Sequence, residues 1–140
     1  MIKIKLLSVG KTKEKWLSEA IEEYSKRLSA ILQIESAWAK DDRQLIEWAH
    51  KEETILCLDP AGKLFTSRDF SALLSQKWEK GGSRLAFVIG GADGLPQELR
   101  TKEKLISLSP LTFTHQITRL VLIEQIYRAT EIQRGSQYHK

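Results

Sequence analysis

The stretch LISLSPLTFTHQITRLVLIEQIYR, residues Leu105 to Arg128, decides how the C-terminal part of the chain folds. A short apolar run leads into a polar bend that contains Pro110. Proline has no backbone N–H and disfavours a helical conformation at the residue before it, Ser109. We therefore expect residues 108–114 to stay extended or looped, with backbone groups that are available to a ligand.

An apolar helix follows this bend, and Thr114 is expected to be its N-cap residue. The apolar positions cover more than one face of the helix: Ile117, Leu120, Val121, Leu122, Ile123, Ile126, Tyr127, Ala129 and Ile132. Such a helix is buried on most sides. We expect it to pack against its own sheet and against a second subunit, and the alternative is a core helix of a monomer.

The bulk composition indicates a globular chain. The 140 residues are enough for a single domain, residues 1–140, and they are 41% hydrophobic and 29% charged. No apolar run reaches the length of a membrane span, so we expect a cytoplasmic protein that has no membrane partner. A single cysteine, Cys57, excludes a disulfide framework and is expected to be buried. The net charge of +4 permits a nucleic-acid partner without requiring one.

Strand and helix patterns alternate along the whole chain. Strands are predicted at residues 2–9, 33–39, 54–58 and 85–89, with helical patterns between them. The predicted fold class is α/β, with a mostly parallel sheet and helices on both faces. The turn signal Asp59-Pro60-Ala61-Gly62 is expected to end the third strand.

Three loops that contain glycine or proline follow predicted strands, at residues 58–62, 90–94 and 108–114. In parallel sheets, ligands bind beyond the carboxyl ends of the strands. The loop Gly90-Gly91-Ala92-Asp93-Gly94 allows close approach of a ligand, although its GGxxG spacing differs from that of dinucleotide folds. Together the loops favour a site for a nucleoside-like ligand over three ordinary turns.

Other kinds of chemistry lack support in the sequence. Gly10-Lys11-Thr12 is not a P-loop, because Lys5 occupies the position of the required earlier glycine. No histidine lies at metal-ligand spacing from another histidine or from Cys57, so no metal is expected. The spacing of Glu124 and Arg128 fits an intrahelical ion pair or a functional pair equally well.

Five ordered motifs resemble those of the ribosomal large subunit methyltransferase H family, the small branch of the SPOUT methyltransferases. They are LDPAG (58–62), VIGGADG (88–94), SLSPLTFTHQITR (107–119), EQIYRA (124–129) and the terminal YHK. The resemblance extends from VGKTK near the N-terminus to the last residue. The chain departs from the family at Gln116, where proline is frequent.

The resemblance implies a SPOUT fold with a deep trefoil knot near the C-terminus. It also implies a homodimer that uses S-adenosyl-L-methionine to methylate N3 of a pseudouridine in 23S rRNA of the assembled ribosome. The cofactor-binding residues that it implies are Leu58, Asp59, Gly90, Gly91, Leu108, Ser109, Pro110, Leu111, Thr112 and Phe113. The catalytic and RNA-facing residues that it implies are His115, Arg119, Glu124, Arg128, Tyr138 and His139.

A chemical hypothesis follows for these polar residues. His139, or a residue that it positions, assists removal of the N3 proton, and Arg128 or Arg119 stabilises the anionic base. Two alternatives remain at this point: a non-catalytic RNA-binding module of the same fold, and an oxidoreductase that binds a nucleotide at the Gly90 loop.

Overall fold

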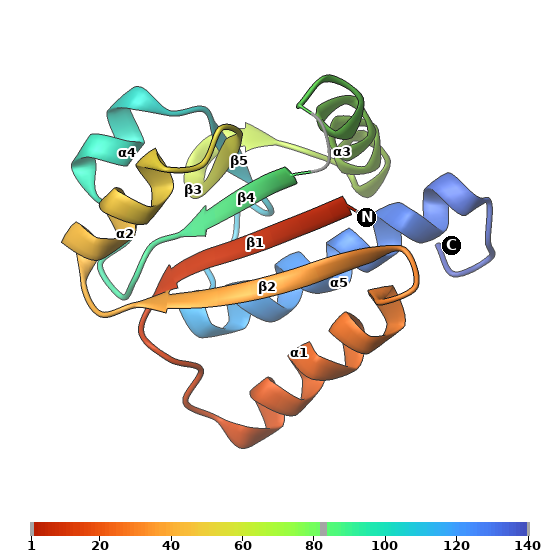
Figure 1. Ribbon diagram of the computed structural model, residues 1–140, viewed down its shortest axis with the longest axis horizontal. Coiled ribbons are helices and arrows are strands. Elements are labelled where there is room, and N and C mark those ends of the chain that lie inside the picture. The colour runs from red at the N-terminus through yellow and green to blue at the C-terminus, as the bar shows by residue number, and fades with distance from the viewer. Residues whose placement is uncertain (1, 82–83, 140) are drawn as a thin grey trace.

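The computed structural model describes residues 2–81 and 84–139, and its five strands form a parallel sheet in the order β2-β1-β4-β3-β5 (Figure 1). The strands are β1 (Ile2–Val9), β2 (Leu32–Ala39), β3 (Ile55–Leu64), β4 (Arg84–Ile89) and β5 (Leu105–Ser107). The helices are α1 (Lys15–Leu28), α2 (Asp42–His50), α3 (Ser67–Gly81), α4 (Gln97–Lys102) and α5 (His115–Arg134). None of the helices in the described ranges is long and apolar enough to span a bilayer.

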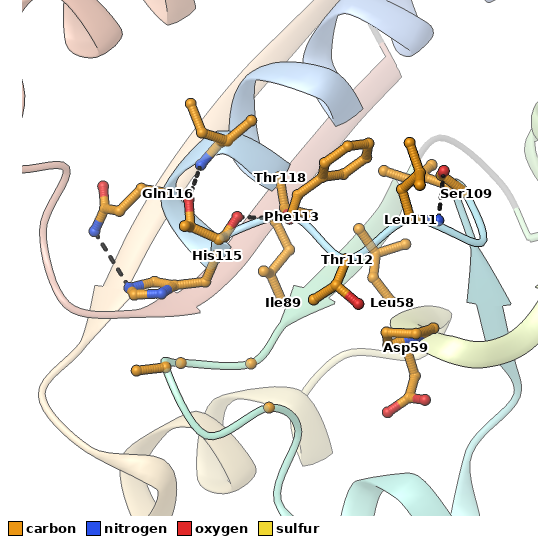
Figure 2. A pocket seen from close by; sticks show the side chains of 18 of the residues that line it. Leu58, Asp59, Ile89, Ser109, Leu111, Thr112, Phe113, His115, Gln116 and Thr118 are labelled. Carbon is orange, nitrogen blue, oxygen red and sulfur yellow. Dashed lines mark hydrogen bonds between the residues drawn. The ribbon is translucent and has the colours of Figure 1, made fainter.

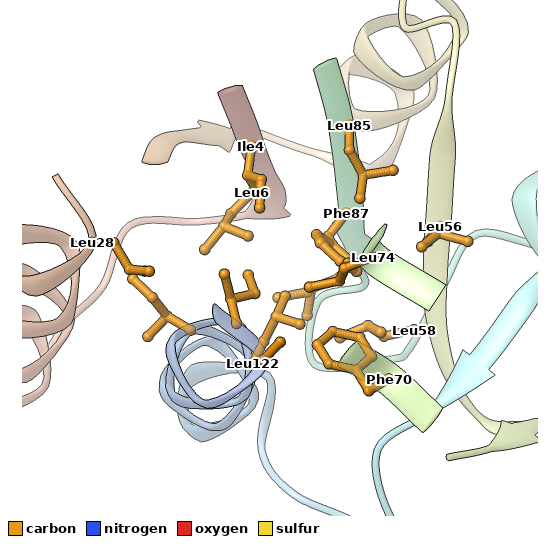
Figure 3. Close-up of a cluster of buried hydrophobic side chains, with 14 of the residues drawn as sticks. Ile4, Leu6, Leu28, Leu56, Leu58, Phe70, Leu74, Leu85, Phe87 and Leu122 are labelled. Atoms are coloured by element: carbon orange, nitrogen blue, oxygen red, sulfur yellow. The ribbon is translucent and has the colours of Figure 1, made fainter. Parts of the chain in front are cut away.

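Helices cover both faces of the sheet, as predicted. Alternate residues of a strand point to opposite faces. In β1, Leu6 therefore packs with α1, α3 and α5, whereas Leu7 packs with α2 and α4. Figure 3 shows the first of these cores, in which Phe87 and Leu122 lie between the sheet and α5. Cys57 is buried in the second core as a free thiol, as expected.

The predicted end of the third strand at Leu58 is wrong. Strand β3 continues to Leu64, and its pairing with β5 shifts between Leu58 and Lys63, so that both of these residues lie opposite Ile106. Residues 59–62 form a bulge in the strand. The turn signal in the sequence was real, but it produces a bulge because β5 pairs with the chain on both sides of it.

Glycine allows two of the loops to pack closely. A Cβ added to Gly62 would lie 2.7 Å from backbone atoms of Ile106, and one added to Gly90 would collide with the backbone of Gly94. Any other residue would push these backbones apart. The glycines therefore bring the bulge of β3 against β5, and they allow the loop after β4 to fold on itself.

Helix α5 begins and ends with regular caps. The hydroxyl of Thr114 accepts a hydrogen bond from the backbone N–H of Ile117 at 3.2 Å, which confirms the predicted N-cap. Gly135 ends the helix in the left-handed conformation. In the single chain, Leu122, Ile123 and Ile126 face the core, whereas Leu120 and Val121 are only partly covered. The expected packing of α5 against a second subunit stays a prediction.

Arg119 connects α5 to the carboxyl end of β1. Its side chain is 0% exposed. Its Nη2 atom donates to the hydroxyl of Ser8 at 3.1 Å and to the carbonyl oxygens of Val9 and Gly10 at 2.9 and 2.6 Å. Its Nη1 atom donates to the hydroxyl of Thr12 at 3.0 Å. The guanidinium therefore holds the turn after β1 against the first turn of α5.

No carboxylate among the described residues forms an ion pair with Arg119. Its guanidinium carbon instead lies 4.0 Å from the ring centroid of Trp38, a cation–π contact. Burial lowers the pKa of Arg119 to about 10, so the side chain stays protonated at neutral pH. A buried cation is tolerated here because five oxygen acceptors, including Oε1 of Gln116, and an aromatic face surround it.

Replacing Gly62 with alanine tests the packing of the bulge. We expect Gly62→Ala to lower the free energy of unfolding by about 1–3 kcal/mol, because the new methyl group forces the bulge away from β5. Urea denaturation measures the change. Ala61→Ser at the exposed neighbouring position is the control and should change stability by less than about 0.5 kcal/mol. Equal stability of the two variants would contradict the close packing.

Replacing Arg119 with methionine tests the connection between β1 and α5. We expect Arg119→Met to lower the free energy of unfolding by about 2–4 kcal/mol, because several buried acceptors lose their donor. The control is Arg43→Met, since the Arg43 side chain is 90% exposed and contacts Glu47 only at 3.9 Å. Amide hydrogen exchange should also increase in residues 10–13 of the Arg119 variant alone. Unchanged exchange in that turn would argue against the proposed connection.

Candidate active site

A cavity of about 660 Å³ lies at the carboxyl ends of β4 and β5 and at the bulge of β3, the strand between them (Figure 2). The bulge of β3 and the loops that follow β4 and β5 supply one half of its wall, with lining residues from Leu58 to Pro60, from Ile89 to Leu95 and from Ser107 to Phe113. The volume is in the range of small-molecule sites, and the position is where parallel sheets bind ligands. The three loops that the sequence singled out therefore meet at one place.

The structure places nearly all of the expected cofactor-binding residues in this cavity. The lining contains Leu58, Asp59, Gly90, Gly91, Leu108, Ser109, Leu111, Thr112 and Phe113. Pro110 does not line the cavity, although it belongs to the same loop. These residues meet in one cavity because β3 lies between β4 and β5 in the sheet, so the segments that carry them are neighbours.

Side chains fix the shape of two of these loops. The hydroxyl of Ser107 donates to the carbonyl oxygen of Ser109 at 2.9 Å, and the hydroxyl of Ser109 accepts from the backbone N–H of Leu111 at 2.9 Å. Asp59 accepts a hydrogen bond from the backbone N–H of Ala61 at 2.8 Å and lies 3.3 Å from Nε of Arg100. These short-range turns preorganise the loop backbones around the cavity.

Apart from His115, the residues of the other half of the cavity were not predicted from the sequence. This half is lined by the start of α1, with Glu14, Trp16 and Leu17, and by the start of α5, residues 114–118. Trp16 belongs to an apolar pattern at helical spacing with Leu17 and Ala20, yet it is 55% exposed. A tryptophan in a helical apolar pattern does not reveal whether it points to the core or to a cavity, so the sequence carried no signal for it.

The six expected catalytic residues separate into three places. His115 lines the cavity. Arg119 lies one turn further along α5, buried against the end of β1, and does not line the cavity. Glu124, Arg128, Tyr138 and His139 form a polar cluster where the C-terminal tail folds back on α5. Lys140 lies outside the described residues.

The polar cluster is held together by direct contacts. Arg128 donates to Glu124 from Nη2 at 2.6 Å and from Nε at 3.0 Å, a two-point ion pair. Its Nη1 atom lies 3.2 Å from Nδ1 of His139, and its guanidinium carbon lies 4.9 Å from the ring centroid of Tyr138. The Tyr138 ring in turn contacts that of Tyr127 edge to face, at 4.8 Å between centroids.

These contacts set the protonation of the cluster. The hydrogen bond to Glu124 is the main reason why the pKa of Arg128 is raised, so Arg128 is a permanent cation. Burial, then a hydrogen bond with Tyr24, raises the pKa of Tyr138 to about 12, so its phenol keeps its proton. Because a guanidinium only donates, Nδ1 of His139 accepts and its ring hydrogen is on Nε2.

Comparison with known proteins matches the whole chain. The family model described as "Predicted SPOUT methyltransferase" matches residues 2–139. A protein of Protochlamydia amoebophila named ribosomal RNA large subunit methyltransferase H is 66% identical over 140 residues, which is 100% of both chains. The protein of that name from Streptococcus mutans is 40% identical, over 99% of this chain and 100% of its own.

Solved structures of low sequence identity share the fold. A probable methylase family protein from Haemophilus influenzae aligns with a TM-score of 0.58 at 12% identity, over 99% of this chain and 70% of its own. A methyltransferase from Legionella pneumophila, solved with the bound cofactor SAM, has a TM-score of 0.53 at 15% identity and covers 92% of this chain and 66% of its own. The chain therefore has the SPOUT fold and belongs to the SPOUT methyltransferases, within the ribosomal RNA large subunit methyltransferase H family.

Proposed function

We propose that this protein is an S-adenosylmethionine-dependent enzyme that methylates N3 of a pseudouridine in 23S rRNA of the assembled ribosome. The observation that carries the proposal is the cavity built by the bulge of β3 and the loops that follow β4 and β5. Full-length relatives at 66% and 40% identity are named as large subunit rRNA methyltransferases. The target base, a pseudouridine, and the target atom, N3, are those implied by the resemblance of the sequence motifs to the family.

The residues of the cavity fit the cofactor. Apolar side chains such as Leu58, Ile89 and Phe113 supply walls for a flat purine ring. The glycine loop and the loop at residues 108–113 supply backbone N–H and C=O groups for its polar atoms. When bound, S-adenosylmethionine supplies a methyl group on a positively charged sulfur. The Legionella neighbour was solved with this cofactor.

The polar cluster of the same chain lies too far from this cavity to act in it. His115, at the cavity, and Arg128, in the cluster, are separated along α5 by roughly 20 Å, at about 1.5 Å of rise per residue. A methyl acceptor must lie within about 3–3.5 Å of its donor. The cavity and the cluster therefore belong to two different sites unless a second subunit brings them together.

A homodimer provides this arrangement. In a two-fold dimer the same helix faces its own copy, so the end of α5 in one subunit can lie next to the beginning of α5 in the other. The partly exposed side chains of Leu120 and Val121 offer apolar surface for such contact. In this proposal one subunit holds the cofactor and its partner supplies the polar cluster.

The residues of the cluster then have distinct roles in proton removal. Arg128, oriented by Glu124, stabilises the negative charge on the base after the N3 proton leaves. Tyr138, with its protonated phenol, donates a hydrogen bond to the base or stacks on it. His139 takes the proton at Nδ1 once this atom is released from Arg128.

Two substitutions separate cofactor binding from methyl transfer. We expect Thr112→Trp to abolish binding of S-adenosylmethionine in calorimetry, because the larger side chain fills the cavity. Arg128→Ala should leave that binding unchanged and slow methylation of ribosomes about 10²–10³-fold. Mass spectrometry of rRNA from a strain that lacks the gene, before and after addition of each protein, measures the methylation. A wild-type protein that binds no cofactor would favour a non-catalytic RNA-binding module.

Mixed dimers test the shared site. Thr112→Trp and Arg128→Ala subunits carrying different affinity tags are co-expressed, and the mixed dimers are purified on both tags. We expect about half of wild-type activity, because one of the two sites then combines an intact cavity with an intact cluster. Each variant alone should be inactive. Mixed dimers as inactive as both parents would show that the cavity and the cluster do not cooperate between subunits.

A further inference from the structure

The proposed cofactor site uses only one half of the cavity. The other half, which is formed by α1 and α5, has not been assigned a ligand. Its wall contains Glu14, Trp16 and Leu17 from α1, and His115 and Thr118 from α5. An exposed tryptophan and a histidine thus face the same space. The expected cofactor residues all come from the loops on the other side of the cavity. A ligand in this half would lie directly beside the cofactor.

The amide of Gln116 has one possible orientation. Its Oε1 atom accepts from the backbone N–H of Lys13 at 3.4 Å and from Nη1 of Arg119 at 3.3 Å. Its Nε2 atom donates to the carbonyl oxygen of Lys11 at 3.1 Å. Because a backbone N–H only donates and a carbonyl only accepts, exchanging the two amide atoms would break these bonds.

This orientation determines which nitrogen of His115 carries the hydrogen. Nε2 of Gln116 lies 3.3 Å from Nε2 of His115 (Figure 2). Since the amide nitrogen is a donor, Nε2 of His115 accepts, and the ring hydrogen is on Nδ1. No hydrogen bond from Nδ1 to another described residue is present, so this N–H is available to a ligand in the cavity.

The surroundings of His115 keep its ring neutral. Burial lowers its pKa, and the positive charges of Arg119 and Lys13 lower the pKa further. Glu14 and Asp59 are the acidic residues in the same cavity wall. A neutral imidazole whose Nε2 is occupied and whose Nδ1 is protonated is a hydrogen-bond donor, and it is not ready to act as a base.

We propose that this half of the cavity binds the uracil-type ring of the target nucleotide, with His115 donating from Nδ1 to a carbonyl oxygen next to N3 and Trp16 stacking on the ring. The inference rests on the proposed function and assigns the substrate half of the same site. Loss of the N3 proton spreads negative charge over the two neighbouring carbonyl oxygens. A fixed neutral donor at one of them stabilises that charge. Stacking of a base on an aromatic side chain is a usual mode of RNA recognition.

Three substitutions of His115 test the donor. The side-chain amide of asparagine places an N–H near the position of Nδ1, whereas that of glutamine places one near Nε2. We expect His115→Ala and His115→Gln to slow single-turnover methylation of ribosomes about 10²–10³-fold, and His115→Asn to be at least about tenfold faster than either. The affinity for S-adenosylmethionine, measured by calorimetry, should be unchanged in all three. Equal rates for the asparagine and glutamine variants would overturn the assignment.

The pH dependence distinguishes a donor from a base. If His115 only donates, the acidic limb of kcat/KM in the wild-type protein is retained in His115→Asn. Disappearance of that limb would mean that His115 takes the proton, which would overturn the donor role. Failure of the wild-type protein to bind the cofactor or to methylate ribosomes is a different result and would refute the proposed function itself.

Substitution of Trp16 tests the stacking surface. We expect Trp16→Ala to raise KM for ribosomes about 5- to 150-fold, with a smaller increase for Trp16→Phe, which retains an aromatic face. Light scattering reports the oligomeric state of each variant. If Trp16→Ala is converted to a monomer, or if its KM is that of the wild-type protein, Trp16 does not stack on the target base and that part of the proposal is wrong.

Discussion

The buried guanidinium of Arg119 is the interaction on which the site depends. It joins the end of the first strand to the beginning of the last helix, two segments more than a hundred positions apart in the chain. Gln116 adds two bonds to the same turn, at Lys11 and Lys13. The position and protonation of His115 therefore follow from a network that is centred on one buried charge.

The other side of the site depends on close contacts between backbones. Gly62 allows the bulge of β3 to pack on Ile106, and Gly90 allows its loop to fold back onto Gly94. Asp59 uses its carboxylate to hold the bulge, through Ala61 and Arg100. These contacts leave few free side-chain charges among the loops. Apolar walls and backbone groups then determine what the loops can bind, which suits a nucleoside better than a highly charged ligand.

The sequence predicted elements whose signals are local. The parallel sheet, the Thr114 cap and the meeting of three loops follow from hydrophobic alternation, capping chemistry and the rule on strand ends. The course of β3 was mispredicted because the pairing that carries the strand past Asp59 involves β5, which is distant in sequence. The buried state of Arg119 and the exposed state of Trp16 depend on tertiary packing, which no local pattern encodes. The trefoil knot implied by the resemblance stays a prediction.

Helix α5 contributes to the cavity, to the core and to the polar cluster of Glu124, Arg128, Tyr138 and His139. Its first turn helps to form the cavity, its buried face packs on the sheet, and its second half, from Glu124 and Arg128 onward, lies next to the returning tail. A rigid helix keeps these two ends apart, so no bending of one chain brings Arg128 to the cofactor loops. In the proposed dimer, a second copy of the same helix in the opposite direction brings the two groups together without any added domain. The sequence pattern that first indicated a second subunit, an apolar helix with more than one apolar face, is thus also the feature that a shared active site requires.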